Sequence, residues 1–480
     1  MGSDAQNFVV SKSVCVIGAG SSGLVAAREL KKEGHNVVIL EQKHDIGGQW
    51  LYDPNVEDED PLGKGLFLKV HSSIYASLRT DSPREIMGFH DFPFIVKEGG
   101  DSRRFPGHGE VLEYLRDFCE YFGLRDLIRF NTRVEYVGML NYKGNGIDHQ
   151  PKDVQELKWI VRSVKDKKNH DGDDRDDDRK AVAETLASEE VFDAVVVANG
   201  HYSHPRLPII KGMEVWNRKQ MHSHVYRTPD PFRNEVVVVV GSSLSGQDIS
   251  MELTNVAKEV HLIARDLMNV TEGLSKVVSK RSNLHLCPMI ESIHEDGRVS
   301  FVDGHCITAD TIIYATGYSY TFPFLDTKGI VSVDDNRVGP LYEHTFPPLL
   351  APSLSFIGIP KKLIGFPFFE SQAKWVAQLL SGKKKLPSYE EMMKSIEEFY
   401  HSCDSSGTPK NHTHTVCSEY CDKYADLAEA PRLEDWRKDL CKSSVLRHIS
   451  DLENFRDSYD YEHPMLQLAY QSPHFTQFRN

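Results

Sequence analysis

The chain alternates short apolar runs with stretches of helical spacing, and it does so twice. The first instance has an apolar run at 14–17, a stretch of helical spacing at 24–32 and a second apolar run at 36–40. The second instance has apolar runs at 236–240 and 259–264. Short apolar runs of this kind are typical of strands buried on both faces, and their alternation with helices is typical of parallel βαβ units. We therefore predict an α/β fold with two such units.

A glycine-rich turn follows the first strand of each predicted unit. The first turn consists of Gly18, Ala19, Gly20, Ser21, Ser22 and Gly23, and the second of Gly241, Ser242, Ser243, Leu244, Ser245 and Gly246. Glycines let the backbone approach a pyrophosphate, whose charge is stabilised by the amide groups and the positive end of the following helix. Ser243 replaces a middle glycine and offers another donor. The order of strand, turn, helix and strand predicts two dinucleotide sites.

The residue that ends the second strand differs between the two units. Glu41, followed by Gln42, ends this strand in the first unit. Its carboxylate would accept hydrogen bonds from ribose hydroxyls and repel a 2′-phosphate, which predicts FAD or NAD. Arg265 ends the corresponding strand in the second unit. Because a guanidinium pairs well with phosphate oxygens, the second site is predicted to bind NADPH.

The pattern between and after the two units predicts how they are connected. Apolar runs at 192–198 and 354–358, and a helical stretch at 370–380, would return the chain to the first unit. Strands are also predicted at 133–137 and 157–164, with a helix at 110–122 before them and a very polar loop at 165–180 after them. Two dinucleotide-binding, Rossmann-like domains result, with the NADPH domain inserted into a discontinuous FAD domain. The predicted bounds are 8–205 for the first part of the FAD domain, 206–325 for the NADPH domain, and 326–480 for the second part with a C-terminal helical segment.

Composition and charge exclude several classes of function. The 480 residues carry a net charge of −14, which gives no basic footprint for nucleic acid. No run approaches the roughly 18 apolar residues of a membrane span, and the polar first residues lack the apolar core of a signal peptide. These features predict a soluble, cytoplasmic protein and leave its oligomeric state open.

The eight cysteines are scattered and predict no disulfide framework. Cys417 and Cys421 form the only close pair, far in sequence from either glycine turn, so a disulfide reductase is not indicated. Together with His412 and His414, this pair matches no standard ligand spacing for zinc. We therefore expect neither a redox cysteine pair nor a metal site.

Further segments combine with the glycine turns into a compound pattern. These segments are the Gly-Gly turn at 46–50, the segment 77–81 with 83–85, the segment 216–231 around His222, and the Ala-Thr-Gly-Tyr sequence at 315–318. The pattern resembles the flavin-containing monooxygenases over nearly the full length of the chain. It is most similar to the plant branch of that family, which includes glucosinolate S-oxygenases.

The resemblance implies roles for residues outside the two glycine turns. Cofactor contacts are expected of Gly48, Gln49, Trp50, Thr80, Thr316 and Gly317. The segment 77–81 is expected at the flavin edge, with Asp81 and His222 in catalytic roles. Asp81 stands where many members have an asparagine close to the flavin. Trp216 and Arg218 stand where the family usually has Phe and Gly, and we expect the arginine to alter the path of the segment.

A flavin and NADPH without redox cysteines or a metal leave dioxygen as the natural second substrate. The resemblance implies that NADPH reduces the flavin, that O2 adds to form a C4a-hydroperoxide, and that one oxygen passes to a soft nucleophile. We expect S-oxygenation of a thioether, such as a methylthioalkyl or S-alkyl compound. Oxygenation of an amine or a carbonyl compound by the same machinery stays open. So does a flavoprotein that acts as an NADPH oxidase or a redox-sensing binding protein.

Overall fold

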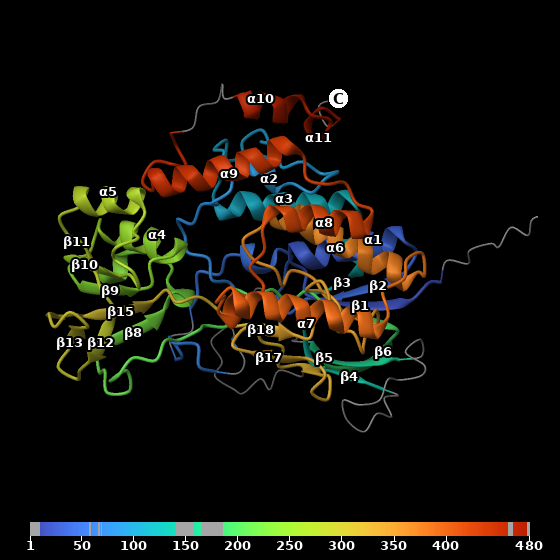
Figure 1. Ribbon diagram of the computed structural model, residues 1–480, viewed down its shortest axis with the longest axis horizontal. Helices are drawn as coiled ribbons and strands as arrows, with labels where there is room; N and C mark the ends of the chain where they lie inside the picture. Colours follow the sequence, from blue (N-terminus) through green and yellow to red (C-terminus); the bar gives the residue numbers. More distant parts are fainter. Residues whose placement is uncertain are drawn as a thin grey trace, which may run out of the picture.

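The structure, a computed structural model, describes residues 10–56, 59–65, 68, 70–140, 157–165, 186–458 and 464–477. Most of the polar segment predicted as a loop at 165–180 lies outside these residues. Figure 1 shows two α/β bodies side by side, with helices from the C-terminal part of the chain lying across the top of both. In the part of the chain described, no helix is long and apolar enough to cross a lipid bilayer.

The larger body is built on a five-stranded parallel sheet. Its strands run in the order β19 (Leu354–Phe356), β7 (Ala194–Val197), β1 (Ser13–Ile17), β2 (Asn36–Leu40) and β3 (Ile128–Arg129). The central strand β1 places Val14 beside Val37 on one side and beside Ala194 on the other. The predicted return of the chain to the first sheet is therefore confirmed.

The smaller body has its own five-stranded parallel sheet, inserted between β7 and β19 of the first. The strand order is β11 (Leu284–Cys287), β10 (Glu259–Ile263), β9 (Val236–Val240), β15 (Thr311–Tyr314) and β8 (Lys219–His222). The chain enters and leaves this body at one place, because the backbone N–H of Arg206 donates to the carbonyl of Gly317 over 2.9 Å. Two Rossmann-type domains, one inserted in the other, match the predicted fold class.

Helices cover both sheets. Helix α1 (Ser21–Lys32) and helix α4 (Leu244–Leu253) follow the two glycine turns, and α6 (Gly365–Leu380) packs against α1. Helix α6 begins five residues before its predicted start, because Pro367 is tolerated in the first turn of a helix. The other helices are α2 (Arg84–Met87), α3 (His108–Tyr121), α5 (Glu272–Lys280), α7 (Tyr389–Ser405), α8 (Ser418–Ala428), α9 (Asp435–Ser450), α10 (Pro464–Gln471) and α11 (Pro473–Thr476).

Smaller sheets flank the two bodies. They comprise β4 (Thr132–Met139), β5 (Trp159–Lys165), β6 (Leu186–Phe192) and β16 (Leu325–Asp326); β12 (Ile290–Ile293), β13 (Arg298–Phe301) and β14 (Cys306–Thr308); and β17 (Ser332–Asp334) with β18 (Arg337–Gly339). One hydrophobic cluster nevertheless runs through both bodies. It contains Val16 of β1, Val239 of β9 and Leu440 of α9, all fully buried.

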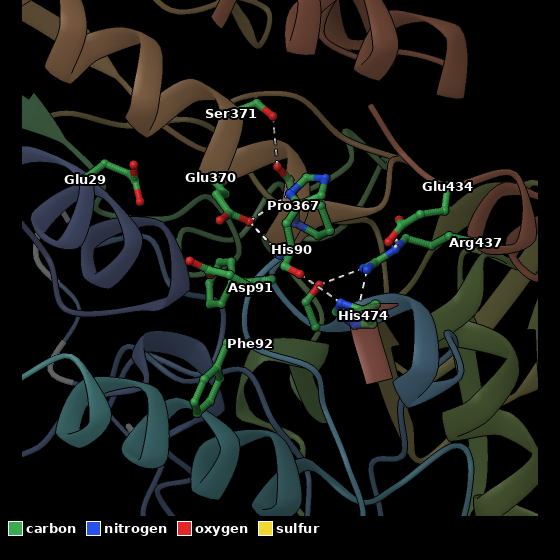
Figure 2. A network of polar contacts seen from close by, with 12 residues as sticks. Glu29, His90, Asp91, Phe92, Pro367, Glu370, Ser371, Glu434, Arg437 and His474 are labelled. Atoms are coloured by element: carbon green, nitrogen blue, oxygen red, sulfur yellow. Dashed lines mark hydrogen bonds and ion pairs between the residues drawn. The ribbon is translucent and has the colours of Figure 1, made fainter. Parts of the chain in front are cut away.

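Buried charges tie the C-terminal helices to the larger body (Figure 2). Arg28 of α1 forms an ion pair with Glu370 of α6, and Oε2 of Glu370 also accepts hydrogen bonds from the backbone N–H and Nδ1 of His90. Nδ1 of His474 in α11 donates to the carbonyl of His90 over 2.9 Å, and Nε2 of His474 accepts from Arg437 of α9 over 3.2 Å. This network (Arg28, Glu370, His90, His474 and Arg437) fixes α9 and α11 on α1 and α6.

Candidate active site

Two glycines of the first turn are required by the protein itself. Gly18 has a φ of +103°, and a Cβ there would lie 2.7 Å from the carbonyl oxygen of Ala198 in the segment after β7. A Cβ on Gly23 would lie 1.8 Å from the carbonyl oxygen of Gly18. Both distances are shorter than any contact a real Cβ makes, so only glycine lets the turn, the helix and the sheet pack this closely.

Gly20 is different, because the protein alone does not require a glycine there. Its φ of −77° suits any residue, and a Cβ would meet the Cα of Gly48 at an ordinary 3.5 Å. Gly48 lies in the short helix η1 (Gly48–Trp50), and the preceding N–H of Gly47 donates to the carbonyl of Ala19 over 3.0 Å. Two backbone segments without side chains therefore face each other, which fits a ligand that contacts backbone at this place.

The second turn repeats the geometry of the first. Gly241 has a φ of +110° with a Cβ position 2.6 Å from the carbonyl oxygen of Ala315, and the Cβ position of Gly246 lies 1.7 Å from the carbonyl oxygen of Gly241. Ser243 has φ −85° and ψ −173°, nearly the values of −77° and −174° found at Gly20. Serine is accommodated because this backbone conformation is extended and open to any residue.

The helices after both turns begin without a capping side chain. Neither α1 nor α4 has a side-chain hydrogen bond at its N-cap or an acidic residue in its first turn. Helix α5 shows the contrast, since the Thr271 side chain accepts from the N–H of Leu274 and Glu272 follows in the first turn. The amide groups and positive ends of α1 and α4 are thus free to stabilise an anion. Both turns fit the pyrophosphate of a dinucleotide.

Glu41 lies directly beside the first turn. Its carboxylate is buried and accepts hydrogen bonds from the backbone N–H groups of Ala19 over 2.7 Å and Lys43 over 2.8 Å. Burial raises the pKa of Glu41, and these hydrogen bonds oppose that rise. The side chain therefore supports the turn, and its remaining lone pairs are available to ribose hydroxyls. Gln42 follows it at the carboxyl end of β2.

Arg265 is exposed just beyond the carboxyl end of β10, and no hydrogen bond or ion pair joins its guanidinium to another described residue. Together with Lys361, Lys362 and Arg206 it forms a cationic cluster whose charges act on His412, at the C-terminus of η6 (Lys410–His412). Burial and the charges of Lys362, Arg265, Lys361 and Arg206 lower the pKa of His412. These cations come from distant parts of the chain, so the sequence pattern identified only Arg265. A cluster of this charge suits a phosphate monoester.

Tyr202 and Tyr318 lie on the two segments that connect the bodies, near Asp81 of the larger body. The Asp81 side chain is 39% exposed, and Tyr202 is 41% exposed. The rings of Tyr202 and Tyr318 lie 5.9 Å apart in a T-shaped contact. Asp81 is close enough to Tyr202 for its charge to raise the pKa of that hydroxyl. The sequence did not predict that Tyr202 and Tyr318 lie near Asp81, because only the fold brings these three residues together.

The environment of Asp81 makes its protonation sensitive to pH. Desolvation and the nearby carboxylate of Asp248 raise its pKa to about 6, while a hydrogen-bonded ion pair with Arg456 opposes the rise. Asp81 is therefore mostly ionised at neutral pH. Thr80 before it is buried, and its hydroxyl donates to the carbonyl of Ser82 over 2.8 Å.

His222 lies at the end of β8 and is fully buried. Its Nδ1 accepts from the N–H of His224 over 3.0 Å, and its ring meets Tyr318 edge-on at 5.1 Å. Burial and His224 lower the pKa of His222 to about 3, so its imidazole is neutral. These contacts place His222 against Tyr318 in the protein interior and favour a positioning role. Its predicted catalytic role remains a prediction.

The other predicted cofactor residues lie in the segment 315–318 and in the Gly-Gly turn at 46–50. Thr316 donates from its hydroxyl to the carbonyl of Arg206 over 2.5 Å, and Gly317 has a φ of +82° with open space around its Cβ position. The carbonyl of Gln49 accepts from the hydroxyl of Ser72, and Trp50 ends η1. Their contacts with a cofactor remain predictions.

The two departures from the family pattern are accommodated within the smaller body. Trp216 is buried, and its Nε1 donates to the carbonyl of Lys219. Arg218 donates from Nη1 to the carbonyl of Ala309 and from Nη2 to the carbonyl of Asp296. The arginine therefore anchors its segment on the smaller body.

Known proteins resemble this chain over its whole length. Residues 283–432 match the family described as flavin-binding monooxygenase-like, and residues 12–338 match the pyridine nucleotide-disulphide oxidoreductase family. Flavin-containing monooxygenase FMO GS-OX-like 8 of Arabidopsis thaliana is 62% identical over 97% of this chain and 96% of its own. FMO GS-OX-like 9 of the same plant is 61% identical over 98% of this chain and 97% of its own.

Two solved structures share the fold. The S-allyl-L-cysteine S-oxygenase of Allium sativum superposes with a TM-score of 0.86 at 43% identity, covering 98% of this chain and 100% of its own. Tmm of Pelagibacter superposes with a TM-score of 0.73 at 24% identity, covering 92% of each chain. Both glycine turns fit a pyrophosphate, and the identity to curated relatives extends over nearly the whole chain. This chain therefore belongs to the flavin-containing monooxygenases, oxidoreductases with FAD and NADPH as cofactors.

Proposed function

We propose that this monooxygenase transfers one oxygen atom of O2 to the sulfur of a small thioether and forms a sulfoxide. The substrate is a methylthioalkyl or S-alkyl compound. The observation that carries this proposal is the full-length similarity to the S-allyl-L-cysteine S-oxygenase, whose chain is matched from end to end at 43% identity. Relatives with names that mark them as GS-OX-like are more similar still.

The residues that hold the two cofactors follow from the turns. The first turn and Gly48 would hold the pyrophosphate of FAD, with Glu41 on the adenosine ribose. The second turn would hold the pyrophosphate of NADPH, with Arg265 and its cationic cluster on the 2′-phosphate. When bound, the flavin supplies the redox chemistry, accepting a hydride from NADPH and activating O2 for transfer of one oxygen.

Asp81 favours sulfur over carbonyl substrates in this proposal. Burial and the charge of Asp248 raise the pKa of Asp81, and Arg456 opposes them, so that the pKa reaches only about 6. The carboxylate is therefore mostly ionised at neutral pH. A negative charge at the flavin edge opposes the build-up of a second one, which disfavours nucleophilic attack on a carbonyl carbon. Electrophilic oxygen transfer to a soft sulfur is then the favoured reaction.

Tyr202 and Tyr318 would exclude water from the reacting atoms. Tyr202 and Tyr318 come from the segments that connect the two bodies, and their rings contact each other. Their hydroxyls stay protonated at neutral pH, because burial raises the pKa of Tyr202 to about 12 and also raises that of Tyr318. They therefore present neutral, largely apolar walls, which suit a thioether.

The test measures three quantities with the FAD-loaded enzyme: NADPH consumed, hydrogen peroxide formed, and product mass. The substrates are S-alkyl cysteines, methylthioalkyl compounds, tertiary amines and a cyclic ketone. We expect a thioether to lower the ratio of peroxide to NADPH and to yield a product heavier by one oxygen, identified as a sulfoxide. N-oxide formation alone, ester formation from a ketone, or a peroxide ratio near one with every thioether would contradict the proposal.

A further inference from the structure

A single arginine from the C-terminal part of the chain joins the two bodies. Arg456 follows α9, and its side chain is only 13% exposed. Its Nη2 donates to Oδ1 of Asp81 and, over 2.8 Å, to Oδ2 of Asp248, while Nη1 donates to Oδ1 of Asp248 over 3.1 Å. Its Nε donates to the carbonyl of Thr80 over 3.1 Å. The guanidinium thus binds two carboxylates and one backbone carbonyl at once.

The partners of Arg456 belong to different bodies. Asp81 and Thr80 lie in the flavin-edge segment of the larger body, whereas Asp248 lies on α4, the helix that follows the NADPH turn. The hydroxyl of Tyr75 donates to Oδ2 of Asp248 over 3.2 Å and adds a second link. Because two carboxylates this close repel each other, the intervening cation is needed to hold both.

Arg456 is itself held in place from both sides. Glu453 forms ion pairs with Lys280 and Arg281 of the smaller body, over 2.8 and 3.0 Å. Asp457 forms an ion pair over 2.8 Å with Arg79, which lies in the flavin-edge segment of the larger body.

The backbone before Arg456 approaches α5 through a glycine. A Cβ on Gly273 would lie 2.6 Å from the N of Leu452, so only glycine allows this approach. Phe455 is buried against Phe105, with ring centroids 5.6 Å apart. The guanidinium of Arg456 is therefore set by its surroundings before any ligand arrives.

We propose that Arg456 is a positioning residue that fixes α4 of the NADPH body against the flavin-edge segment and holds the Asp81 carboxylate in one orientation. This proposal rests on the proposed function, because it assigns both sites to one reaction. Removing Arg456 would have two consequences. The NADPH body would lose its fixed distance to the flavin edge, which slows hydride transfer, since that step depends steeply on alignment. Asp81 would also lose its orientation, which releases peroxide in place of product.

The experiment separates these two consequences by replacing either Arg456 or one of its two carboxylate partners. The variants are Arg456→Met, Arg456→Lys, Asp248→Asn and Asp81→Asn. Arg432→Met is the matched control, since Arg432 is an exposed C-terminal arginine paired with Asp426. Anaerobic flavin reduction at saturating NADPH, per bound FAD, reports hydride transfer. The peroxide-to-NADPH ratio in air with a thioether reports the state of Asp81.

We expect Arg456→Met to reduce flavin at least tenfold more slowly and to release more peroxide. Asp248→Asn should show mainly the first defect, Asp81→Asn mainly the second, and Arg456→Lys intermediate values in both. Arg432→Met should match the wild type. The proposal is overturned if Arg456→Met reduces flavin and couples oxygen as the wild type does, or if it only lowers thermal stability with both rates per bound FAD unchanged.

If Arg456→Met is too unstable to measure, Arg456→Lys and Asp248→Asn test the proposal instead. The first keeps the positive charge at position 456, and the second keeps Arg456 and removes the charge of its partner. The reduction measurement uses neither oxygen nor a thioether. A wild type that makes no sulfoxide would therefore refute the proposed function, while the effect of Arg456 on reduction would still support or overturn its link between α4 and the flavin edge.

Discussion

At the scale of single residues, glycines at corresponding places carry different constraints. Gly18, Gly23, Gly241 and Gly246 each have a backbone carbonyl oxygen within 2.7 Å of the Cβ position, so the turns themselves need them. Gly20 has no such conflict. Replacement of Gly246 by alanine, which the sequence pattern linked mainly to NADPH use, would therefore distort the turn as well. Gly20 is the glycine that reports on a cofactor without disturbing the fold.

The variant Gly20→Ala should fold normally and bind FAD at least tenfold more weakly, a loss of about 1.4 kcal/mol or more. Its methyl group meets only Gly48 at 3.5 Å within the protein but occupies space next to the expected pyrophosphate. Flavin content after purification and titration of the apoprotein with FAD provide the measurement. Gly109→Ala is the control, since its Cβ lies in open space on α3. Equal flavin affinity in both variants would remove Gly20 from the FAD site.

Arg265→Ala should reduce the preference for NADPH over NADH. A charge-assisted contact with phosphate is worth about 1.5–3 kcal/mol, so the ratio of kcat/KM values should fall by roughly tenfold or more. The remaining cations, Lys361, Lys362 and Arg206, should preserve some preference. Steady-state kinetics with both nucleotides measure the ratio, with the exposed Arg298→Ala on the same body as control. An unchanged ratio for Arg265→Ala would assign the phosphate to the other cations.

At the scale of elements, α1 and α6 depend on buried charge as well as apolar packing. Arg28 and Glu370 lie between these helices, and His90 joins the pair from the loop after α2. Burial raises the pKa of Glu370, but the hydrogen bonds from His90 and the charge of Arg28 outweigh it and lower the pKa to about 2. The folded protein therefore stabilises the ionised form of Glu370.

This shift has a defined pH dependence. Because the folded pKa of Glu370 lies below the ordinary value of 4.5, its contribution is fully present above pH 4.5 and is lost as pH falls toward 2. Glu370→Gln should cost roughly 3–5 kcal/mol at pH 7, since it leaves Arg28 buried with less compensation. It should also weaken the fall in stability between pH 4.5 and 2. Urea unfolding at several pH values measures both, with the exposed Glu398→Gln as control. Equal losses in the two variants would contradict a special role for Glu370.

At the scale of the whole molecule, two bodies share one core. The hydrophobic cluster that includes Val16, Val239 and Leu440 passes through both sheets and α9. The C-terminal helices lie across both bodies, as Figure 1 shows, and α9 packs on α5 and on α2. The inserted body is therefore joined to its host by far more than its two connecting segments.

We expect the two bodies to unfold together. Flavin fluorescence and far-ultraviolet circular dichroism should give coincident thermal midpoints, because cooperative units that share a core do not separate. NADP⁺ at a hundred times its Kd should add about 2.7 kcal/mol to the free energy of unfolding. Both midpoints should therefore rise, although NADP⁺ is expected to contact mainly the inserted body. Two separate transitions, or a shift in only one signal, would show that the bodies are independent.

The sequence by itself determined the parts of this protein that are local in the chain. Apolar runs, glycine turns and the residues that end the second strands predicted both Rossmann-type units, with NADPH in one and FAD or NAD in the other, because these signals lie within a few tens of residues and reflect backbone geometry. The family resemblance then pointed to FAD. The bounds of the domains and the roles of single site residues remain predictions. The family resemblance pointed to Asp81 and His222, but it did not show that Asp81 is partly exposed and His222 fully buried.

Tertiary structure alone decided what surrounds these residues. Asp81 meets Arg456 and Asp248 across 375 and 167 positions of sequence, and Arg265 joins cations from other segments. Such contacts depend on how helices and sheets pack, and no periodic signal marks them in the chain. Charge and burial at a site are properties of that packing, so the protonation of Asp81, the neutrality of His222 and the link through Arg456 follow only from the folded molecule.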